Sequence, residues 1–184
     1  PDMVEAMRAD TILVATGSER IVPRIDGIEN AVHALDIYKP DAEVGEEAVI
    51  IGGGLVGCEL ALHLGREGKK VTVVEMTSHY GGQCAPMYRM GMDYYLQKYR
   101  INFMLETACL SVEKDGVTVR TADGETKKVK ADNVIYCVGM KSVDKPFFDM
   151  FNSAETVISI GDCRRVGKVG NAVQDGYNSV IDLA

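Results

Sequence analysis

The chain has 184 residues, 46% of them hydrophobic, with five cysteines, no tryptophan and a formal net charge of −7. This length suits one domain or a domain with part of another, and the apolar fraction is sufficient to form a core. The acidic balance argues against a nucleic-acid partner or an anionic membrane surface, and no apolar run approaches the roughly 18 residues that a membrane-spanning helix requires.

Five short apolar runs are typical of buried parallel strands. They cover residues 11–14, 48–51, 71–74, 134–138 and 157–160. Between the second and third runs, the segment from Leu55 to Glu67 is rich in apolar residues and is followed by Gly68, which predicts a helix. This order of strand, helix and strand predicts a βαβ unit.

A second helix is predicted from Pro86 to Lys98, because proline suits the first turn of a helix. Met87, Met90 and Tyr94 occur at i, i+3 and i+7, the spacing of one helical face. A stripe of this kind is more typical of a core face than of a methionine-rich binding site. We therefore expect these three side chains to be buried.

Residues 101–129 change to short alternating segments with turns, which predicts antiparallel strands. The pairs Asp115-Gly116 and Asp123-Gly124 are strong short-range signals for hairpin turns. A three-stranded antiparallel meander is therefore predicted inside an otherwise α/β chain.

The chain also contains an internal similarity. Residues 10–17 and residues 132–139 each begin with Asp, continue as an apolar strand and reach a glycine seven residues later. One copy precedes the predicted βαβ unit and the other closes it. This arrangement predicts two related nucleotide-binding folds, with the second inserted into the first.

The turn after the second apolar run carries the pattern G-x-G-x-x-G at Gly52, Gly54 and Gly57. A strand precedes it and a helix follows it, which is the context in which the pattern indicates dinucleotide binding. Gly52 allows the tight turn, Gly54 lets the backbone approach a pyrophosphate, and Gly57 allows close packing of helix on strand. The helix N-terminus offers its N–H groups to the phosphates. The predicted phosphate-binding turn is completed by Gly53, Leu55 and Val56.

Glu75 follows the next strand and lies 23 residues after Gly52. A carboxylate at this point can accept both ribose hydroxyls of NAD, and it repels the additional phosphate of NADP. Residues 76–79 include no Arg or Lys that would hold that phosphate. The sequence therefore favours NAD(H) over NADP(H). The alternatives are a glycine-rich turn without a ligand and a solvated glutamate at a strand end.

These motifs resemble those of the FAD/NAD pyridine-nucleotide oxidoreductases of the glutathione-reductase fold. Residues 14–17 resemble the A-T-G motif of that family, and residues 52–75 resemble its NAD(P)H fingerprint. Residues 157–162 resemble the late flavin-binding motif, and residues 170–176 resemble the helix start that points at the flavin pyrimidine ring. All four motifs occur in the order and spacing of the family, and together they cover nearly the whole chain.

Within this family, Gly52 to Ala61 and Gly161 to Cys163 are most similar to the C-terminal reductase part of NADH:flavin oxidoreductases related to old yellow enzyme. These include 2-enoate reductase, 2,4-dienoyl-CoA reductase and trimethylamine dehydrogenase. The N-terminal flavin fingerprint of the family is missing, as are the old-yellow-enzyme barrel and its iron–sulfur cysteines. The chain therefore resembles the middle and end of a flavin domain without its pyrophosphate loop.

The five cysteines form no C-x-x-C or C-x-x-x-x-C pair. We therefore expect reduced thiols, no metal site and no disulfide reduction by this chain alone. They are Cys58, Cys84, Cys109, Cys137 and Cys163.

The predicted fold is α/β. A Rossmann-like NAD-binding domain, with a parallel sheet and a three-stranded antiparallel meander, is predicted for residues 42–144. It is inserted into an incomplete FAD-binding domain of the same type, formed by residues 1–41 and 145–184. The chain starts at Pro1 without an initiator Met and shows no signal peptide, so we expect an excised piece of a longer cytoplasmic protein.

The resemblance implies a flavin site in the split domain. Asp162 would accept a hydrogen bond from the ribitol chain of FAD; the alternative is a plain turn residue. The N–H groups near Ala172 and Val173, at a helix N-terminus, would favour negative charge on the flavin ring. The other residues assigned to this site are Thr16, Gly17 and Gly161.

The resemblance also assigns residues to the nicotinamide end of NAD. Glu59 matches the position whose carboxylate contacts the nicotinamide carboxamide; the alternative is an ordinary acidic residue in a first helical turn. Leu55 matches a position where some members carry an aromatic lid, and a leucine cannot stack as an aromatic ring does. Val138 and Gly139 would pass under the bound NAD, because a glycine at a strand end allows close backbone approach.

The implied function is the NADH-binding part of a flavin-dependent oxidoreductase. Hydride would pass from NADH to FAD and on to an acceptor, of enoate or dienoyl-CoA type, that a missing domain handles. The cofactors carry this chemistry, so we assign no catalytic side chain and expect the isolated chain to be inactive.

Two alternative functions share some of these sequence features. The first is a non-catalytic NAD-sensing module, which has no need of a flavin motif. The second is a methyltransferase, against which the meander and the glycine-ended strand at Gly139 argue. Surfaces suited to the absent flavin half could also pair two copies of the chain.

Overall fold

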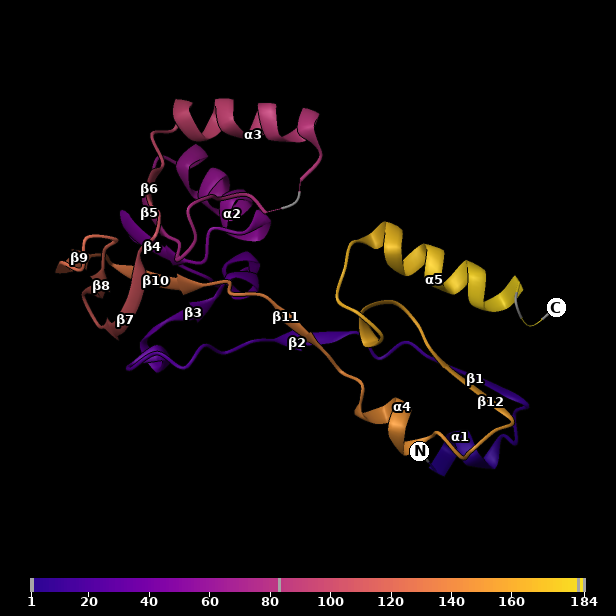
Figure 1. Cartoon of the computed structure of the whole chain (residues 1–184). Helices are drawn as coiled ribbons and strands as arrows, with labels where there is room; N and C mark the ends of the chain where they lie inside the picture. The colour runs from indigo at the N-terminus through magenta and orange to yellow at the C-terminus, as the bar shows by residue number, and fades with distance from the viewer. Residues whose placement is uncertain (1, 83, 182, 184) are drawn as a thin grey trace. The chain divides into compact units, whose positions relative to one another are not determined.

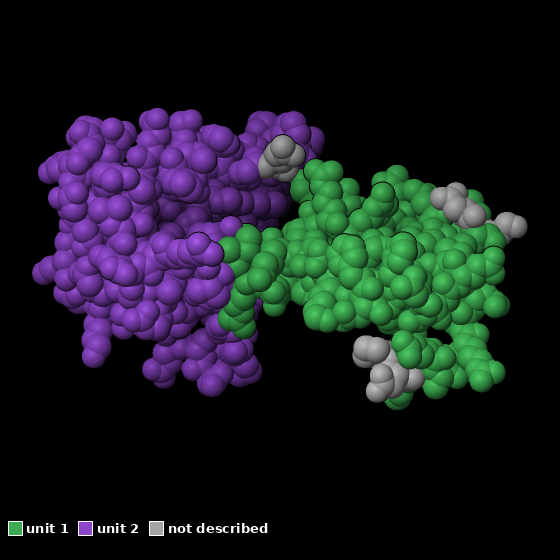
Figure 2. All heavy atoms as spheres, turned by 60° about the horizontal axis from the view of Figure 1, so that its bottom comes forward, with its two compact units in different colours: residues 1–21, 139–184 green, residues 22–138 purple. Residues whose placement is uncertain are grey.

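The computed structural model describes residues 2–82, 84–181 and 183. The chain forms two compact units (Figure 2). The smaller unit consists of Pro1–Ile21 and Gly139–Ala184, and the larger unit is Val22–Val138. The larger unit is therefore an insertion in the chain of the smaller one.

The unit boundaries differ from those suggested by the sequence, at 41/42 and 144/145. Ile25, Ile28 and Ala31 pack against a core of the larger unit, and the strand that follows them joins its sheet. In the smaller unit, residues 140–142 pair with residues 18–20. The cofactor that each unit binds stays a prediction.

A parallel sheet of five strands forms the centre of the larger unit (Figure 1). In spatial order its strands are β3 (Val32–His33), β10 (Asn133–Tyr136), β4 (Glu47–Ile51), β5 (Lys70–Val74) and β6 (Asn102–Met104). Helix α2 (Leu55–Arg66) connects β4 to β5, and α3 (Pro86–Lys98) connects β5 to β6. The predicted βαβ unit and parallel sheet are confirmed. Two short 3₁₀ helices flank β3, η1 (Ile28–Asn30) and η2 (Ala34–Tyr38).

Both faces of this sheet are buried. Successive side chains of a strand point to opposite faces, so each strand contributes to both cores. On one face, Ile50 and Val73 pack with Leu60 and Leu64 of α2. On the other face, a second core packs against an antiparallel sheet, and its members include Val49, Val74, Val117 and Val119. A sheet covered on both faces explains why its strands are continuous apolar runs in the sequence.

The antiparallel sheet is the predicted meander. Its strands are β7 (Ala108–Glu113), β8 (Gly116–Arg120) and β9 (Thr126–Lys130). Both Asp-Gly pairs lie at the hairpin connections, where Gly116 and Gly124 have φ values of 141° and 85°. The prediction of antiparallel strands is wrong for residues 102–104, because β6 pairs in parallel with β5 at the edge of the larger sheet. A strand of three residues is too short for its pattern to indicate its partner.

The buried face of α3 is not the predicted one. Met87, Met90 and Tyr94 are 83%, 75% and 62% exposed. Met92 and Leu96, one turn apart, are buried against α2 and the sheet instead. Apolar residues occur on two faces of this helix, so periodicity alone could not identify the packed one.

The smaller unit contains two pairs of strands. Strand β1 (Thr11–Val14) pairs in parallel with β12 (Thr156–Ser159), and β2 (Ser18–Arg20) pairs antiparallel with β11 (Met140–Ser142). Its helices are α1 (Asp2–Ala6), α4 (Lys145–Asp149), η3 (Gly161–Cys163) and α5 (Val169–Ile181). The small core consists of Ile12, Val14, Met150 and Cys163.

Helix α5 has an apolar face that the described residues leave uncovered. None of its residues is buried. The exposed side chains include Val169, Val173, Tyr177, Val180 and Ile181. Among residues 2–82, 84–181 and 183, no helix combines the length and apolar character needed to cross a bilayer.

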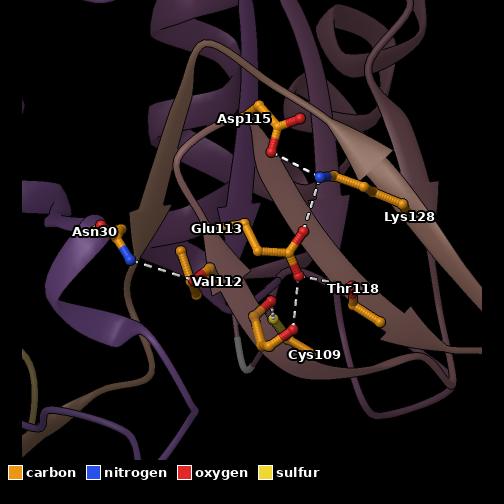
Figure 3. Close-up of polar contacts among 8 residues, drawn as sticks. Asn30, Cys109, Val112, Glu113, Asp115, Thr118 and Lys128 are labelled. Atoms are coloured by element: carbon orange, nitrogen blue, oxygen red, sulfur yellow. Dashed lines mark hydrogen bonds and ion pairs between the residues drawn. The ribbon is translucent and has the colours of Figure 1, made fainter.

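A polar network covers the outer surface of the meander (Figure 3). Glu113 Oε1 accepts hydrogen bonds from Ser111 Oγ at 2.9 Å and from Thr118 Oγ1 at 2.8 Å. Lys128 Nζ lies between two carboxylates, 2.9 Å from Glu113 Oε2 and 2.6 Å from Asp115 Oδ1. The Lys128 ammonium and the two hydroxyls lower the pKa of Glu113 from 4.5 to about 2.

We predict that Glu113→Gln loses a stabilising contribution that depends on pH. The folded-state pKa of Glu113 lies below its unfolded value, so its ionised form stabilises the fold above about pH 4.5, and this contribution is lost as the pH falls toward about 2. Urea titrations should show a constant gap in midpoint between wild type and variant near neutrality, and a closing gap below pH 4.5. Glu125→Gln, in the neighbouring turn, is the control. A gap that does not change with pH would contradict the assignment.

Candidate functional site

The glycine turn between β4 and α2 is fixed by close backbone contacts. Gly52 has a φ of 110°, and a Cβ on it would lie 2.6 Å from Cys137 O at the end of β10. A Cβ on Gly57 would lie 2.0 Å from Gly52 O. The roles that the sequence suggested for these two glycines, a tight turn and close packing of α2, agree with this geometry.

Gly54 differs from its neighbours because it borders open space. No atom lies within 4 Å of a Cβ placed on it, and its φ of −64° suits any residue. Gly54 is the N-cap of α2 without a side-chain cap, and the first helical bond runs from Cys58 N to Gly54 O. The N–H groups of Leu55, Val56 and Gly57 precede that bond, so the turn fits an anion such as a pyrophosphate.

The backbone of Gly53 is held from both sides by the loop that follows β5. Its N–H donates to Glu75 Oε2 at 2.7 Å, and its carbonyl accepts from Gly81 N at 2.7 Å. A Cβ on Gly53 would lie 2.9 Å from the Cβ of Glu75. The loop after β5 therefore contributes to the shape of the glycine turn. The sequence did not reveal this contribution.

The second partner of the Glu75 carboxylate is Thr77, whose hydroxyl can donate to either of two acceptors. Glu75 Oε1 accepts from Thr77 N and lies 2.8 Å from Thr77 Oγ1. The same hydroxyl lies 2.9 Å from His79 O, and a hydroxyl carries one proton. When that proton points to His79 O, a lone pair of Glu75 Oε1 becomes free to accept a ribose hydroxyl. The predicted ribose site is thus compatible with the geometry.

Two thiols, the buried Cys58 and the partly buried Cys137, lie against the glycine turn. Cys137 Sγ lies 3.2 Å from Gly52 O, and Cys58 Sγ lies 3.5 Å from Gly53 O. Burial raises the pKa of Cys137 to about 12 and that of Cys58 to about 11. Both remain neutral thiols near pH 7, so they pack the turn and are poor nucleophiles.

The four residues predicted at the nicotinamide end of NAD differ from one another in burial and in hydrogen-bond partners. Leu55 packs partly against the core, and Glu59 is exposed and accepts a 2.6 Å hydrogen bond from Tyr88 Oη of α3. Val138 N lies 3.5 Å from the Cβ position of Gly52. Gly139, in the smaller unit, has a φ of 111° and accepts from Ile21 N at 3.1 Å.

The smaller unit brings most of the predicted flavin residues together. A hollow of about 370 Å³ is lined by residues that include Gly17, Gly161, Asp162 and Ala172. Asp162 accepts from Ser18 Oγ and from Gly167 N, each at 3.0 Å. Thr16 and Val173 do not line this hollow. The Thr16 hydroxyl donates to Val143 O at 2.6 Å.

The start of α5 differs from the position that the sequence suggested. The helix begins at Val169, and Ala172 N already donates to Lys168 O at 3.3 Å. The helix therefore starts three residues before Ala172, and the assignment of Ala172 and Val173 to the flavin stays a prediction. Asp175, which the sequence did not single out, accepts from Gly161 N at 3.2 Å and so ties α5 to η3.

Comparison with known proteins decides the family. A family model described as pyridine nucleotide-disulphide oxidoreductase matches residues 2–176. The chain belongs to this family. The resemblance identified from the sequence is confirmed.

Relatives of this oxidoreductase domain are much longer proteins. An NADH oxidase of Thermoanaerobacter brockii is 32% identical over 183 residues, which is 96% of this chain and 28% of that protein. A cinnamate reductase of Clostridium sporogenes is 30% identical over 176 residues, or 95% of this chain and 26% of that protein. The structure of a 2-naphthoyl-CoA reductase complex aligns with a TM-score of 0.87 and 30% identity, covering 96% of this chain and 27% of its own.

We predict that Gly54→Ala mainly weakens NADH binding, whereas Gly57→Ala mainly lowers the stability of the fold. Ala at Gly54 meets no protein atom, so its cost is limited to about 1 kcal/mol of helix capping, but its methyl group occupies the expected phosphate position and should weaken NADH binding at least about tenfold. Ala at Gly57 clashes with Gly52 O and should destabilise the fold by about 3 kcal/mol. Urea unfolding and calorimetric NADH titration measure the two quantities.

The control for this pair is Gly91→Ala, in α3, where a Cβ also meets no atom within 4 Å. It should leave NADH affinity unchanged. Unchanged NADH affinity of folded Gly54→Ala would contradict the assignment of the turn.

Proposed function

We propose that this chain is the NADH-binding part of a flavin-dependent oxidoreductase. The observation that carries the proposal is the open space over Gly54, which the first N–H groups of α2 border. The Glu75 carboxylate lies next to this turn, because it accepts from Gly53 N. A pyrophosphate fits the N–H groups at the start of α2, and an adenosine ribose fits the Glu75 carboxylate. Family membership supports a nicotinamide cofactor at this place.

We propose NADH as the preferred cofactor over NADPH. The Glu75 carboxylate is fixed by Gly53 N and Thr77, so its charge would face an added phosphate directly. Arg89 is the first Arg or Lys after Glu75, and it is engaged elsewhere. Its Nε donates to both Asp93 oxygens at 2.9 and 3.0 Å, and its Nη1 donates to Tyr80 O at 2.8 Å.

The smaller unit supports the proposal of an incomplete flavin domain. It presents a parallel pair of strands and an amphipathic helix without a buried residue, whereas parallel sheets are normally covered on both faces. We propose that strands outside this sequence complete its sheet and cover α5. The residues toward FAD would be Asp162, Gly161 and Gly17 at the hollow.

In this proposal, the protein binds and orients the two cofactors, and the cofactors carry the redox chemistry. When bound, the nicotinamide supplies a hydride and the flavin accepts it. The glycine turn would hold the pyrophosphate, Glu75 the ribose and Glu59 the carboxamide, while Asp162 would hold the ribitol chain. No side chain of this chain is assigned a proton transfer.

The acceptor would be bound by a domain outside this sequence. The similar proteins named cinnamate reductase and 2-naphthoyl-CoA reductase favour an unsaturated carboxylic acid or its thioester. All five cysteines are free, which supports a reducing, cytoplasmic location. A non-catalytic NAD sensor is the second candidate, and the hollow around Asp162 argues against it.

We predict that Glu75→Arg shifts the cofactor preference toward NADPH. The substitution removes the ribose acceptor and the repulsion of a 2′-phosphate, so NADH affinity should fall about tenfold or more. It also removes the acceptor of Gly53 N, a loss that both nucleotides share, so NADPH affinity should fall much less than NADH affinity. Glu125→Arg makes the same charge change in a hairpin turn and should alter neither. Calorimetric titration with both nucleotides provides the measurement. Unchanged affinity for both in Glu75→Arg would overturn the cofactor assignment.

The proposed function as a whole is tested by titrating this chain with NADH, NADPH and FAD in parallel. Saturable NADH binding, weaker NADPH binding and no FAD binding are expected. A chain that binds none of the three at millimolar concentrations would contradict the proposal. NADH-dependent reduction of added flavin by the longer protein would separate an enzyme from a sensor.

A further inference from the structure

The carboxylate of Glu59 is held by a residue of a different helix. Tyr88 Oη, in the first turn of α3, donates to Glu59 Oε1 at 2.6 Å. The two residues are 29 positions apart in the chain. Tyr88 is 49% exposed, so about half of its surface remains open to solvent. This hydrogen bond links the first turn of α3 to α2.

Three basic side chains, His63, Arg66 and Lys98, line the same hollow as this pair. His63 Nε2 lies 3.5 Å from Glu67 Oε1, and the Lys98 ammonium lies 5.6 Å from the centre of the Tyr95 ring. Within residues 2–82, 84–181 and 183, Glu59 takes part in no ion pair. A neutral phenol therefore orients Glu59 without neutralising its charge.

We propose that Tyr88 is a positioning residue that directs Glu59 toward the carboxamide of a bound nicotinamide. This inference rests on the proposed function. The phenol occupies Oε1 of the carboxylate, and Oε2 remains an acceptor for a carboxamide N–H, because an ionised carboxylate accepts hydrogen bonds on both oxygens. An exposed glutamate on a helix otherwise samples several rotamers, and fixing it in advance reduces the entropy lost on binding.

The donor is retained over a wide pH range. The hydrogen bond to Glu59, together with burial, raises the pKa of Tyr88 to about 12. The phenol therefore remains protonated at neutral and moderately alkaline pH. The contact holds Glu59 in place without a change in the charge of either helix.

The test compares NADH with ADP-ribose, which lacks the nicotinamide, by calorimetric titration of this chain. Tyr88→Phe keeps the ring and removes the donor. It should weaken NADH binding about 3- to 10-fold, the range expected for one hydrogen bond, and leave ADP-ribose binding unchanged. Tyr95→Phe, which removes a phenol from the same helix, is the matched control and should change neither affinity.

A double-mutant cycle separates positioning from a purely structural role. Glu59→Ala should weaken NADH binding at least as much as Tyr88→Phe does, and adding Tyr88→Phe to it should cause no further loss. The proposal is overturned if Tyr88→Phe leaves NADH affinity unchanged, weakens NADH and ADP-ribose equally, or still weakens NADH in the Glu59→Ala background. If the wild-type chain binds ADP-ribose as tightly as NADH, the nicotinamide adds no affinity. That result would overturn the role of Tyr88 and Glu59 and leave the proposed dinucleotide site intact. Binding of neither ligand would overturn the proposed function itself.

Discussion

The close approach of three backbone segments at Gly52 is the constraint on which the candidate site depends. At this point the end of β4, the end of β10 and the first turn of α2 meet without room for a side chain on Gly52 or Gly57. The contact brings the N-terminus of α2 to the carboxyl end of the sheet, where ligands of open α/β sheets bind. A larger residue at either glycine would displace the helix whose N–H groups are proposed to bind the phosphates.

The loop after β5 holds this turn through two backbone hydrogen-bonding groups of Gly53. Gly53 is fixed through its N–H by Glu75 and through its carbonyl by Gly81 N. The residue expected to bind the ribose therefore also shapes the phosphate site, so a substitution at Glu75 acts on both. The Thr77 hydroxyl has two acceptors at nearly equal distances, so its proton can leave Glu75 Oε1 for His79 O if a ribose hydroxyl takes its place. Pre-organisation of this kind reduces the conformational cost of binding.

The sequence predicted the parts of the fold that repeat a strong local pattern. The βαβ unit and the two Asp-Gly hairpins were confirmed, because apolar runs and turn residues report burial and turns directly. It failed where the outcome depends on tertiary contacts, as in the exposed Met87 face of α3 and the parallel pairing of β6. For the same reason the glycine pattern could identify the turn, whereas the bonds of Tyr88, Thr77 and Asp175 needed coordinates.

Backbone amide NMR during an NADH titration tests the central claim most directly, namely that the turn between β4 and α2 holds the dinucleotide pyrophosphate. The account predicts saturable shifts of the amide resonances of Gly54, Leu55, Val56 and Gly57, because a phosphate would accept hydrogen bonds from N–H groups in this turn. Saturable binding that shifts other regions of the chain and leaves these four amides unmoved would contradict it.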